Sequence, residues 1–150
     1  MKNQLYIMIG PSGCGKSTWA REQVERSPLS TVIVSTDTIR GGLWGDEGDQ
    51  KQGDVVFLAA YTQLECLLTQ GYNVIFDATN LTPSARKRPC EIARSCGANI
   101  VFCVASTPMK ECIARQETRA RRVPIYIIEN QFKKFADPVY TEDWDGVVYF

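Results

Sequence analysis

The sequence predicts one α/β domain in which about five parallel strands form a sheet flanked by helices. Short, almost continuously apolar runs alternate along the chain with longer segments of helical periodicity, which is typical of a parallel sheet covered on both faces. The length of 150 residues suits a single domain. We find no internal repeat, low-complexity tract or linker, so residues 1–150 are expected to form one domain.

The expected elements follow one another in a regular order, joined by right-handed crossovers. The expected strands are residues 5–9, 31–35, 73–77, 99–105 and 146–150. The expected helices are residues 16–26 and 54–70, a segment opened by Pro83, a segment opened by Pro108, and residues 124–135. Thr82 and Thr107 precede the two opening prolines and are expected to cap those helices. Pro89 is expected to kink or split the helix in which it lies.

The composition excludes several classes of function. The chain has no histidine, which excludes histidine-assisted zinc sites, Ser-His-Asp triads and histidine general bases. Its formal net charge is zero, so the whole molecule is no polycation for nucleic acid. Charge is nevertheless uneven: residues 86–122 hold nine basic and three acidic side chains. This basic stretch is either a set of solvated helix faces or a wall facing phosphates.

The cysteines and the N-terminal residues favour a cytoplasmic protein. The six cysteines form no CxxC pair or compact disulfide framework, and Cys103 lies in an apolar run, so reduced thiols are expected. The opening residues lack the apolar length and cleavage site of a signal peptide. No stretch approaches the ~20 apolar residues of a membrane span.

A phosphate-binding motif follows the first expected strand. Residues 10–17, GPSGCGKS, match the pattern G-x-x-x-x-G-K-[ST], with a strand before it and a helix after it. Its backbone N–H groups are expected to bind the phosphates of ATP or another NTP. Lys16 would neutralise the β- and γ-phosphates, and the Ser17 hydroxyl would hold Mg²⁺. The expected nucleotide-binding residues of the loop are Gly10, Pro11, Ser12, Gly13, Cys14, Gly15, Lys16, Ser17 and Thr18.

Two acids follow the second and third strands, at the edge of the sheet where the phosphate loop also lies. Asp37 is placed to accept the proton of an attacking hydroxyl or to cap a helix, and the two roles are compatible. If it opens a helical turn, Arg40 shares its face and would grip an anionic acceptor. Asp77 fits a magnesium ligand, directly or through water, or else serves a turn. For Thr79 and Asn80, polar contacts and structural roles are equally supported.

Arginines recur in residues 115–122, RQETRARR. If this segment is helical, Arg115, Arg119 and Arg122 share one face. They would then form a lid over the γ-phosphate that stabilises the transferring charge. The alternative is a solvated basic helix end that the helix dipole favours.

Several segments together resemble the kinase domain of the polynucleotide 5′-kinases, in the phage end-healing enzyme and the bacterial RNA-repair kinase-phosphatase. The segments are GPSGCGKSTWARE, VSTDTIRGGL, FDATNLTPSARK and the arginine-rich stretch, and the similarity runs from about residue 5 to 136. The resemblance implies transfer of the NTP γ-phosphate to the 5′-hydroxyl of RNA or DNA, with Mg²⁺ as cofactor. It makes Asp37 the general base, Arg40 the contact to an acceptor phosphate and Arg119 the lid arginine, with Arg122 a second.

The chain also departs from that family. It carries no phosphatase or ligase domain, so it phosphorylates ends without removing 3′-phosphates, or it is a fragment. Residues 41–53 form an insert whose glycines 41, 42, 45 and 48 predict a mobile segment near the acceptor. Trp44 in it either stacks on a base or packs. The sequence leaves the oligomeric state open.

Two other functions share the phosphate loop. A small-molecule hydroxyl kinase would use the same chemistry but would not need Arg40 and the basic residues 86–94. An NTP-binding switch would phosphorylate no acceptor and would leave Asp37 without a role.

Overall fold

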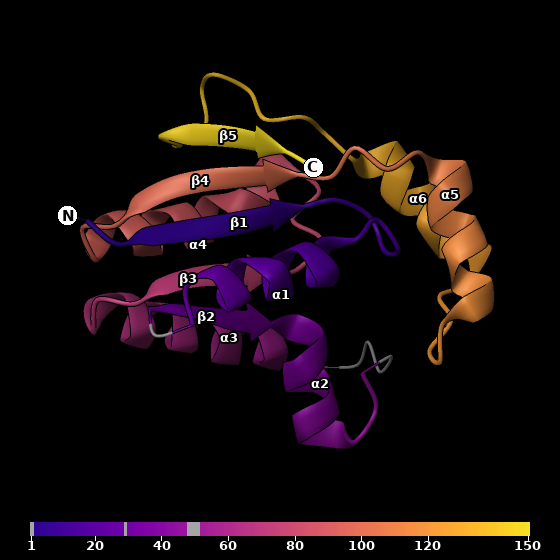
Figure 1. Cartoon of the computed structure of the whole chain (residues 1–150), viewed down its shortest axis with the longest axis horizontal. Helices are drawn as coiled ribbons and strands as arrows, with labels where there is room; N and C mark the ends of the chain where they lie inside the picture. Colours follow the sequence, from indigo (N-terminus) through magenta and orange to yellow (C-terminus); the bar gives the residue numbers. More distant parts are fainter. Residues whose placement is uncertain (1, 29, 48–51) are drawn as a thin grey trace.

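Five parallel strands form a single sheet in the order β2-β3-β1-β4-β5 (Figure 1). We describe a computed structural model in which residues 2–28, 30–47 and 52–150 are placed. The strands are β1 (Gln4–Ile9), β2 (Thr31–Ser35), β3 (Asn73–Asp77), β4 (Asn99–Val104) and β5 (Gly146–Tyr149). All four pairings are parallel. The predicted fold class and strand positions are confirmed.

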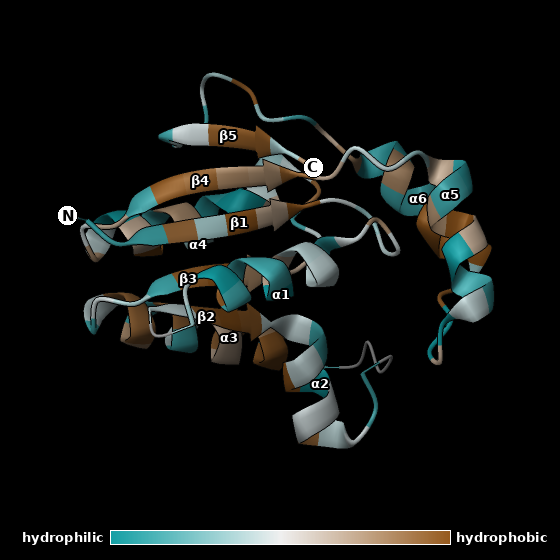
Figure 2. Cartoon of the chain, in the orientation of Figure 1, coloured by the Kyte–Doolittle hydropathy of each residue, from teal (hydrophilic) through white to brown (hydrophobic). Residues whose placement is uncertain are grey.

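Helices cover both faces of this sheet. They are α1 (Lys16–Arg26), α2 (Thr36–Trp44), α3 (Gly53–Thr69), α4 (Pro83–Ser95), α5 (Met109–Ala114) and α6 (Ile125–Lys134), with a 3₁₀ turn η1 (Arg115–Thr118) after α5. Side chains of β1 point alternately to the two faces of the sheet. Leu5, Ile7 and Ile9 join the core under α3 and α4, whereas Met8 packs with Ala20 of α1. Figure 2 shows strands that are mostly brown, with helices of mixed colour around them.

The topology places a binding edge at the carboxyl end of β1. The chain leaves β1 toward β2 and β3 on one side, and later adds β4 on the other, so the strand order reverses beside β1. Open α/β sheets bind ligands at such a point. The helices α5 and α6 stand together beyond this edge, next to the loop that joins β1 to α1 (Figure 1).

Most predicted helix signals are confirmed, and the predicted cap at Thr107 is wrong. Thr82 caps α4, since its hydroxyl oxygen accepts a hydrogen bond from the Ala85 N–H at 3.2 Å. Thr107 does not cap α5: Pro108 is the N-cap residue, and the Thr107 hydroxyl instead donates to the Cys14 carbonyl at 3.1 Å. Pro89 does not split its helix, because α4 runs unbroken from Pro83 to Ser95.

The expected mobile insert 41–53 is largely ordered at its start. Gly41 and Gly42 lie inside α2, and Gly45 ends that helix with a left-handed φ of 73°. Gly48 lies outside the described residues. Trp44 is partly exposed and is absent from the lining of the cleft described below. Within the described parts of the chain, no helix is both long enough and apolar enough to cross a bilayer.

The six cysteines are free thiols that differ sharply in accessibility. Cys66 is exposed, whereas burial raises the pKa of the Cys103 thiol to about 12. Since the thiolate is the reactive form, we expect iodoacetamide at about pH 8 to label Cys66 far faster than Cys103. Mass spectrometry of the native protein checks this: Cys66→Ser should remove the fast labelling, and Cys103→Ser should leave it unchanged. Rapid labelling of Cys103 would contradict the buried position.

Candidate active site

The loop between β1 and α1 makes a turn that depends on glycine. Gly13 and Gly15 have left-handed φ values of 80° and 90°, which side chains rarely adopt. A Cβ atom at Gly13 would also lie 2.6 Å from Gln116 Nε2 and 2.8 Å from the Cys112 carbonyl oxygen. Glycine therefore allows both the turn and the close approach of α5. The first turn of α1 contains no acid, which leaves its positive end available to an anion.

Side chains from the far side of the cleft hold this loop in place. Gln131 of α6 accepts a hydrogen bond from the Ser12 N–H at 2.8 Å. Arg115 Nη1 donates to the Gly13 carbonyl at 3.1 Å, and Thr107 donates to the Cys14 carbonyl. Local sequence patterns do not predict these contacts of Gln131 and Thr107, because each contact joins residues about a hundred positions apart.

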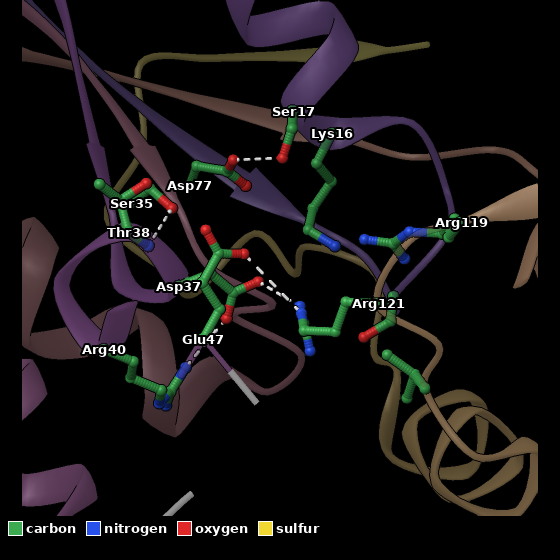
Figure 3. A network of polar contacts seen from close by, with 12 residues as sticks. Lys16, Ser17, Ser35, Asp37, Thr38, Arg40, Glu47, Asp77, Arg119 and Arg121 are labelled. Atoms are coloured by element: carbon green, nitrogen blue, oxygen red, sulfur yellow. Dashed lines mark hydrogen bonds and ion pairs between the residues drawn. The ribbon is translucent and has the colours of Figure 1, made fainter. Parts of the chain in front are cut away.

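The first residues of α1 are Lys16 and Ser17, and Ser17 contacts Asp77 at the end of β3. Lys16 Nζ donates to the Pro11 carbonyl at 2.7 Å, and the Ser17 hydroxyl donates to Asp77 Oδ2 at 2.7 Å (Figure 3). Asp77 is only 8% exposed at the end of β3. A hydroxyl and a carboxylate fit Mg²⁺, which prefers a few protein oxygens and completes its shell with water and phosphate oxygens. Among the described residues, no group of three or more His, Cys, Asp or Glu side chains is arranged to hold a metal.

Asp37 lies in the first turn of α2 and is not its cap. The cap is Ser35, whose side-chain oxygen accepts a hydrogen bond from the Thr38 N–H at 3.2 Å. The capping interpretation of Asp37 is therefore wrong, and its carboxylate points into the cleft (Figure 3). Arg40 does share its face, as predicted, and Arg40 Nη1 donates to Asp37 Oδ1 at 3.2 Å.

The second partner of Asp37 is Arg121, which the sequence analysis did not single out. Arg121 Nη2 donates to Asp37 Oδ2 at 2.9 Å, and its Nε lies 3.8 Å from Glu47 Oε2. Figure 3 shows this guanidinium facing both carboxylates. The helical spacing used for the arginine-rich stretch passed over Arg121, because that spacing assumed one continuous helix.

The predicted arginine face is wrong, although the arginines do line one cleft. The helix α5 ends at Ala114, a 3₁₀ turn follows, and Arg119 is extended with φ −87° and ψ 143°. Arg119 Nη1 donates to Gln116 Oε1 at 3.5 Å, and Arg122 Nη2 donates to the Glu117 carbonyl at 2.9 Å. These arginines therefore lie on an irregular segment instead of a helical face.

A single cleft of about 1100 Å³ joins these groups. This volume is slightly above the usual range for small-molecule sites. Its lining includes the residues of the phosphate loop from Ser12 to Thr18, Asp37, Arg40, Asp77, Thr79, Arg115, Arg119, Arg121 and Arg122. The structure thus brings together the predicted base, the predicted metal ligands and the predicted lid. Gly10 and Pro11 lie behind the lining, and the Gly10 N–H donates to the Thr79 carbonyl.

The basic stretch 86–122 divides into two parts: Arg115, Arg119, Arg121 and Arg122 line the cleft, whereas the basic residues 86–94 lie elsewhere. None of them lines the cleft. Arg86 is fully buried, and its guanidinium donates to both carboxylate oxygens of Glu142 at 2.8 and 3.1 Å. Arg94 pairs with Asp143 and Asp145, which raises the pKa of the Arg94 guanidinium. Asn80 is also buried, and its amide donates to the Met8 carbonyl, a structural role.

Known proteins share both the sequence pattern and the fold. The sequence is 27% identical over 146 residues to L-seryl-tRNA(Sec) kinase of Methanococcus maripaludis, which covers 94% of this chain and 56% of that protein. A chain of the Pnkp1/Rnl/Hen1 RNA repair complex superposes with a TM-score of 0.78 at 24% identity, over 89% of this chain and 44% of that one. A gluconokinase from Sinorhizobium meliloti 1021 superposes with a TM-score of 0.63 at 18% identity, over 97% and 81%.

The chain spans about half the length of the first two of these relatives. The superposed structures share this fold, and the chain has the five-stranded parallel sheet of a P-loop kinase fold. The profile of the AAA domain family AAA_33 matches residues 5–139. Because this match extends over most of the sequence, the protein belongs to that family.

Proposed function

We propose that the protein is an ATP-dependent kinase that transfers a γ-phosphate to the 5′-hydroxyl end of a polynucleotide, RNA or DNA. The observation that carries the proposal is the position of Asp37, between two arginines and in the same cleft as Lys16. A carboxylate there suits a hydroxyl acceptor, and flanking guanidinium groups suit an acceptor that carries phosphate. Two relatives support an RNA acceptor by name, a seryl-tRNA(Sec) kinase and an RNA repair complex.

The donor phosphates would bind to the N–H groups of the loop and the N-terminus of α1. Lys16 would release the Pro11 carbonyl and neutralise the β- and γ-phosphates, and Arg119 would approach them from the lid segment. Ser17 and Asp77 are the residues that would hold Mg²⁺, which supplies charge neutralisation at the phosphate oxygens. The lid segment and α6 would exclude water from the donor.

In the transfer step, Asp37 would accept the proton of the acceptor hydroxyl as its oxygen attacks the γ-phosphorus. The new bond joins that oxygen to phosphorus, and the bond from phosphorus to the β–γ bridging oxygen breaks. The nucleoside diphosphate leaves with the electron pair. Arg40 would hold the phosphate that follows the acceptor nucleoside, because its guanidinium is fixed beside the base and is 9% exposed.

A small-molecule hydroxyl kinase is the second candidate, and one observation favours it. The arginines of residues 86–94 pair with acids and leave no basic wall for a long polynucleotide. A nucleotide switch has less support, since it gives Asp37 and its two arginines no task.

Label transfer tests these alternatives directly. The protein would be incubated with γ-labelled ATP, Mg²⁺ and one of three acceptors: a 5′-hydroxyl RNA, a 5′-hydroxyl DNA or a sugar. Label on an oligonucleotide supports the proposal. Label on the sugar alone supports the second candidate, and free phosphate without labelled acceptor supports the switch.

Arg40→Ala should raise the KM for a 5′-hydroxyl oligonucleotide by about tenfold or more, through loss of a charge-assisted hydrogen bond. The KM for ATP should change by less than about twofold, since Arg40 faces the acceptor side. Steady-state kinetics with each substrate varied in turn would measure both. Arg88→Ala is the matched control, because Arg88 makes the same i,i+3 ion pair on an exposed face of α4. Equal effects on both KM values would place Arg40 at the donor instead.

A further inference from the structure

The largest fully buried side chain among the described residues belongs to Arg86 of α4. Its Nε and Nη2 donate to the two carboxylate oxygens of Glu142, and its Nη1 donates to the Asn80 and Ala136 carbonyls at 3.0 Å each. Apolar side chains of similar volume often serve stability as well as a buried ion pair does. A further role would explain why an arginine occupies this position.

The Asn80 carbonyl belongs to a connection that supports the start of the phosphate loop. Asn80 follows β3 with a left-handed φ of 46°, and its amide donates to the Met8 carbonyl at 2.8 Å. The neighbouring Thr79 carbonyl accepts a hydrogen bond from the Gly10 N–H at 2.9 Å. Because Gly10 opens the phosphate loop, Arg86 holds the connection that fixes where this loop begins.

The Ala136 carbonyl lies just beyond the end of α6, a helix that supports the loop at a second point. The Ala136 N–H donates to the Leu81 carbonyl at 2.9 Å, so the end of α6 is joined to the same connection between β3 and α4. Within α6, Gln131 accepts a hydrogen bond from the Ser12 N–H at 2.8 Å. Arg86 therefore fixes the end of the helix that carries Gln131 to the loop.

We propose that Arg86 is a positioning residue for the phosphate loop. Through two carbonyls, one guanidinium fixes the supports that contact the loop at Gly10 and at Ser12. Its five donors lie in one plane, so it can serve a carboxylate and two carbonyls together. The loop binds phosphates only while its N–H groups converge, and displacement of either support would lower the affinity. This inference rests on the donor half of the proposed function, the binding of an NTP to this loop.

Arg94 is a matched control on the same helix. It also pairs with acids of the connection between α6 and β5, since its guanidinium donates to Asp143 and to Asp145 at 2.8 Å. Its remaining acceptor within the described residues is the Ala98 carbonyl at 3.4 Å. Arg94 therefore ties the same connection to α4 without touching either support of the loop.

Nucleotide affinity tests the role of Arg86 separately from its effect on stability. The double variant Arg86→Met/Glu142→Leu removes both charges together, so it should stay folded, but the two carbonyls lose the guanidinium. Isothermal titration should show that the Kd for Mg²⁺-ATP rises by about tenfold or more. Arg94→Met should keep that Kd within about twofold of the wild-type value, and Arg86→Lys, which retains a donor, should lie between. Urea denaturation followed by circular dichroism would check that each variant is folded.

Gln131→Met supplies a readout that a loss of stability alone would not change. In the wild-type background it removes one hydrogen bond to the loop, so the Kd for ATP should rise by about three- to tenfold. In the background of Arg86→Met/Glu142→Leu, α6 no longer holds Gln131 against the loop. The same substitution should then raise the Kd by less than about twofold, because the two changes act on one support.

The outcomes separate this inference from the proposed function. A double variant that binds ATP as tightly as the wild type, or additive effects of Gln131→Met and the double substitution, overturns the role of Arg86. If the double variant does not fold, Asn80→Gly keeps the left-handed backbone and removes only the amide, and an unchanged Kd then overturns the inference. A wild-type protein that binds no ATP overturns the proposed function and this inference together. An Arg86-dependent Kd in a protein that labels no acceptor supports the positioning role and removes the proposed transfer.

Discussion

Replacing Asp37 with asparagine is expected to lower kcat for phosphate transfer by about a hundred- to ten-thousandfold. The amide keeps the shape of the side chain but cannot accept the proton of the attacking hydroxyl. Nucleotide affinity should stay within about twofold, because the hydrogen bonds of Asp37 within the described parts of the chain go to Arg40 and Arg121 and not to the phosphate loop. Single-turnover transfer assays would measure the first quantity, and titration with a fluorescent ATP analogue would measure the second.

Asp54→Asn is the matched control for this variant. Asp54 occupies the first turn of α3, as Asp37 occupies the first turn of α2, and it is exposed and outside the cleft. Its loss should leave both quantities unchanged. If Asp37→Asn keeps more than about a tenth of the wild-type rate, Asp37 is not the general base. If the affinity for the ATP analogue falls instead, the Asp37 carboxylate contributes to binding of the nucleotide and not to proton transfer.

The sequence was sufficient to predict those parts of the site that lie at strand ends. Parallel strands share one carboxyl edge, so the loop after β1, Asp37 after β2 and Asp77 at the end of β3 had to meet there. The contact between Ser17 and Asp77 confirms this reasoning at atomic distance. Strand positions followed from short apolar runs, and the cap at Thr82 from a local threonine-proline signal.

The lid could not be predicted from spacing. Spacing by three and four implies a shared face only in a continuous helix, and the helix ends at Ala114. The change to a 3₁₀ turn and then to extended backbone brings Arg121, instead of Arg122, to Asp37. Gln131 reaches Ser12 across 119 positions, and such a distant contact leaves no local pattern in the sequence.

The basic residues 86–94 lie away from the cleft for a different reason. Charge patterns assume solvated side chains, but Arg86 is fully buried, where it pairs with Glu142. The partner lies 56 positions away in the connection between α6 and β5. The same guanidinium donates to the Asn80 and Ala136 carbonyls. It therefore connects α4 to the segments that contain Asn80, Ala136 and Glu142.

Glu142→Ala is therefore expected to lower the free energy of unfolding by about 3–5 kcal/mol. The change removes the carboxylate but leaves the Arg86 charge buried, with only two carbonyl oxygens as partners. Urea denaturation followed by circular dichroism would measure the loss.

Asp143→Ala provides a comparison one residue away. Asp143 is 56% exposed and pairs with Arg94, which is 35% exposed, so its loss should cost less than about 1 kcal/mol. The double variant Arg86→Met/Glu142→Leu should recover much of the stability, because apolar side chains of similar size leave no unpaired charge. If Glu142→Ala and Asp143→Ala cost the same small amount, Arg86 finds water or another acid when Glu142 is removed. A double variant as unstable as Glu142→Ala would show that the pair contributes through its hydrogen bonds to the backbone and not through its charge.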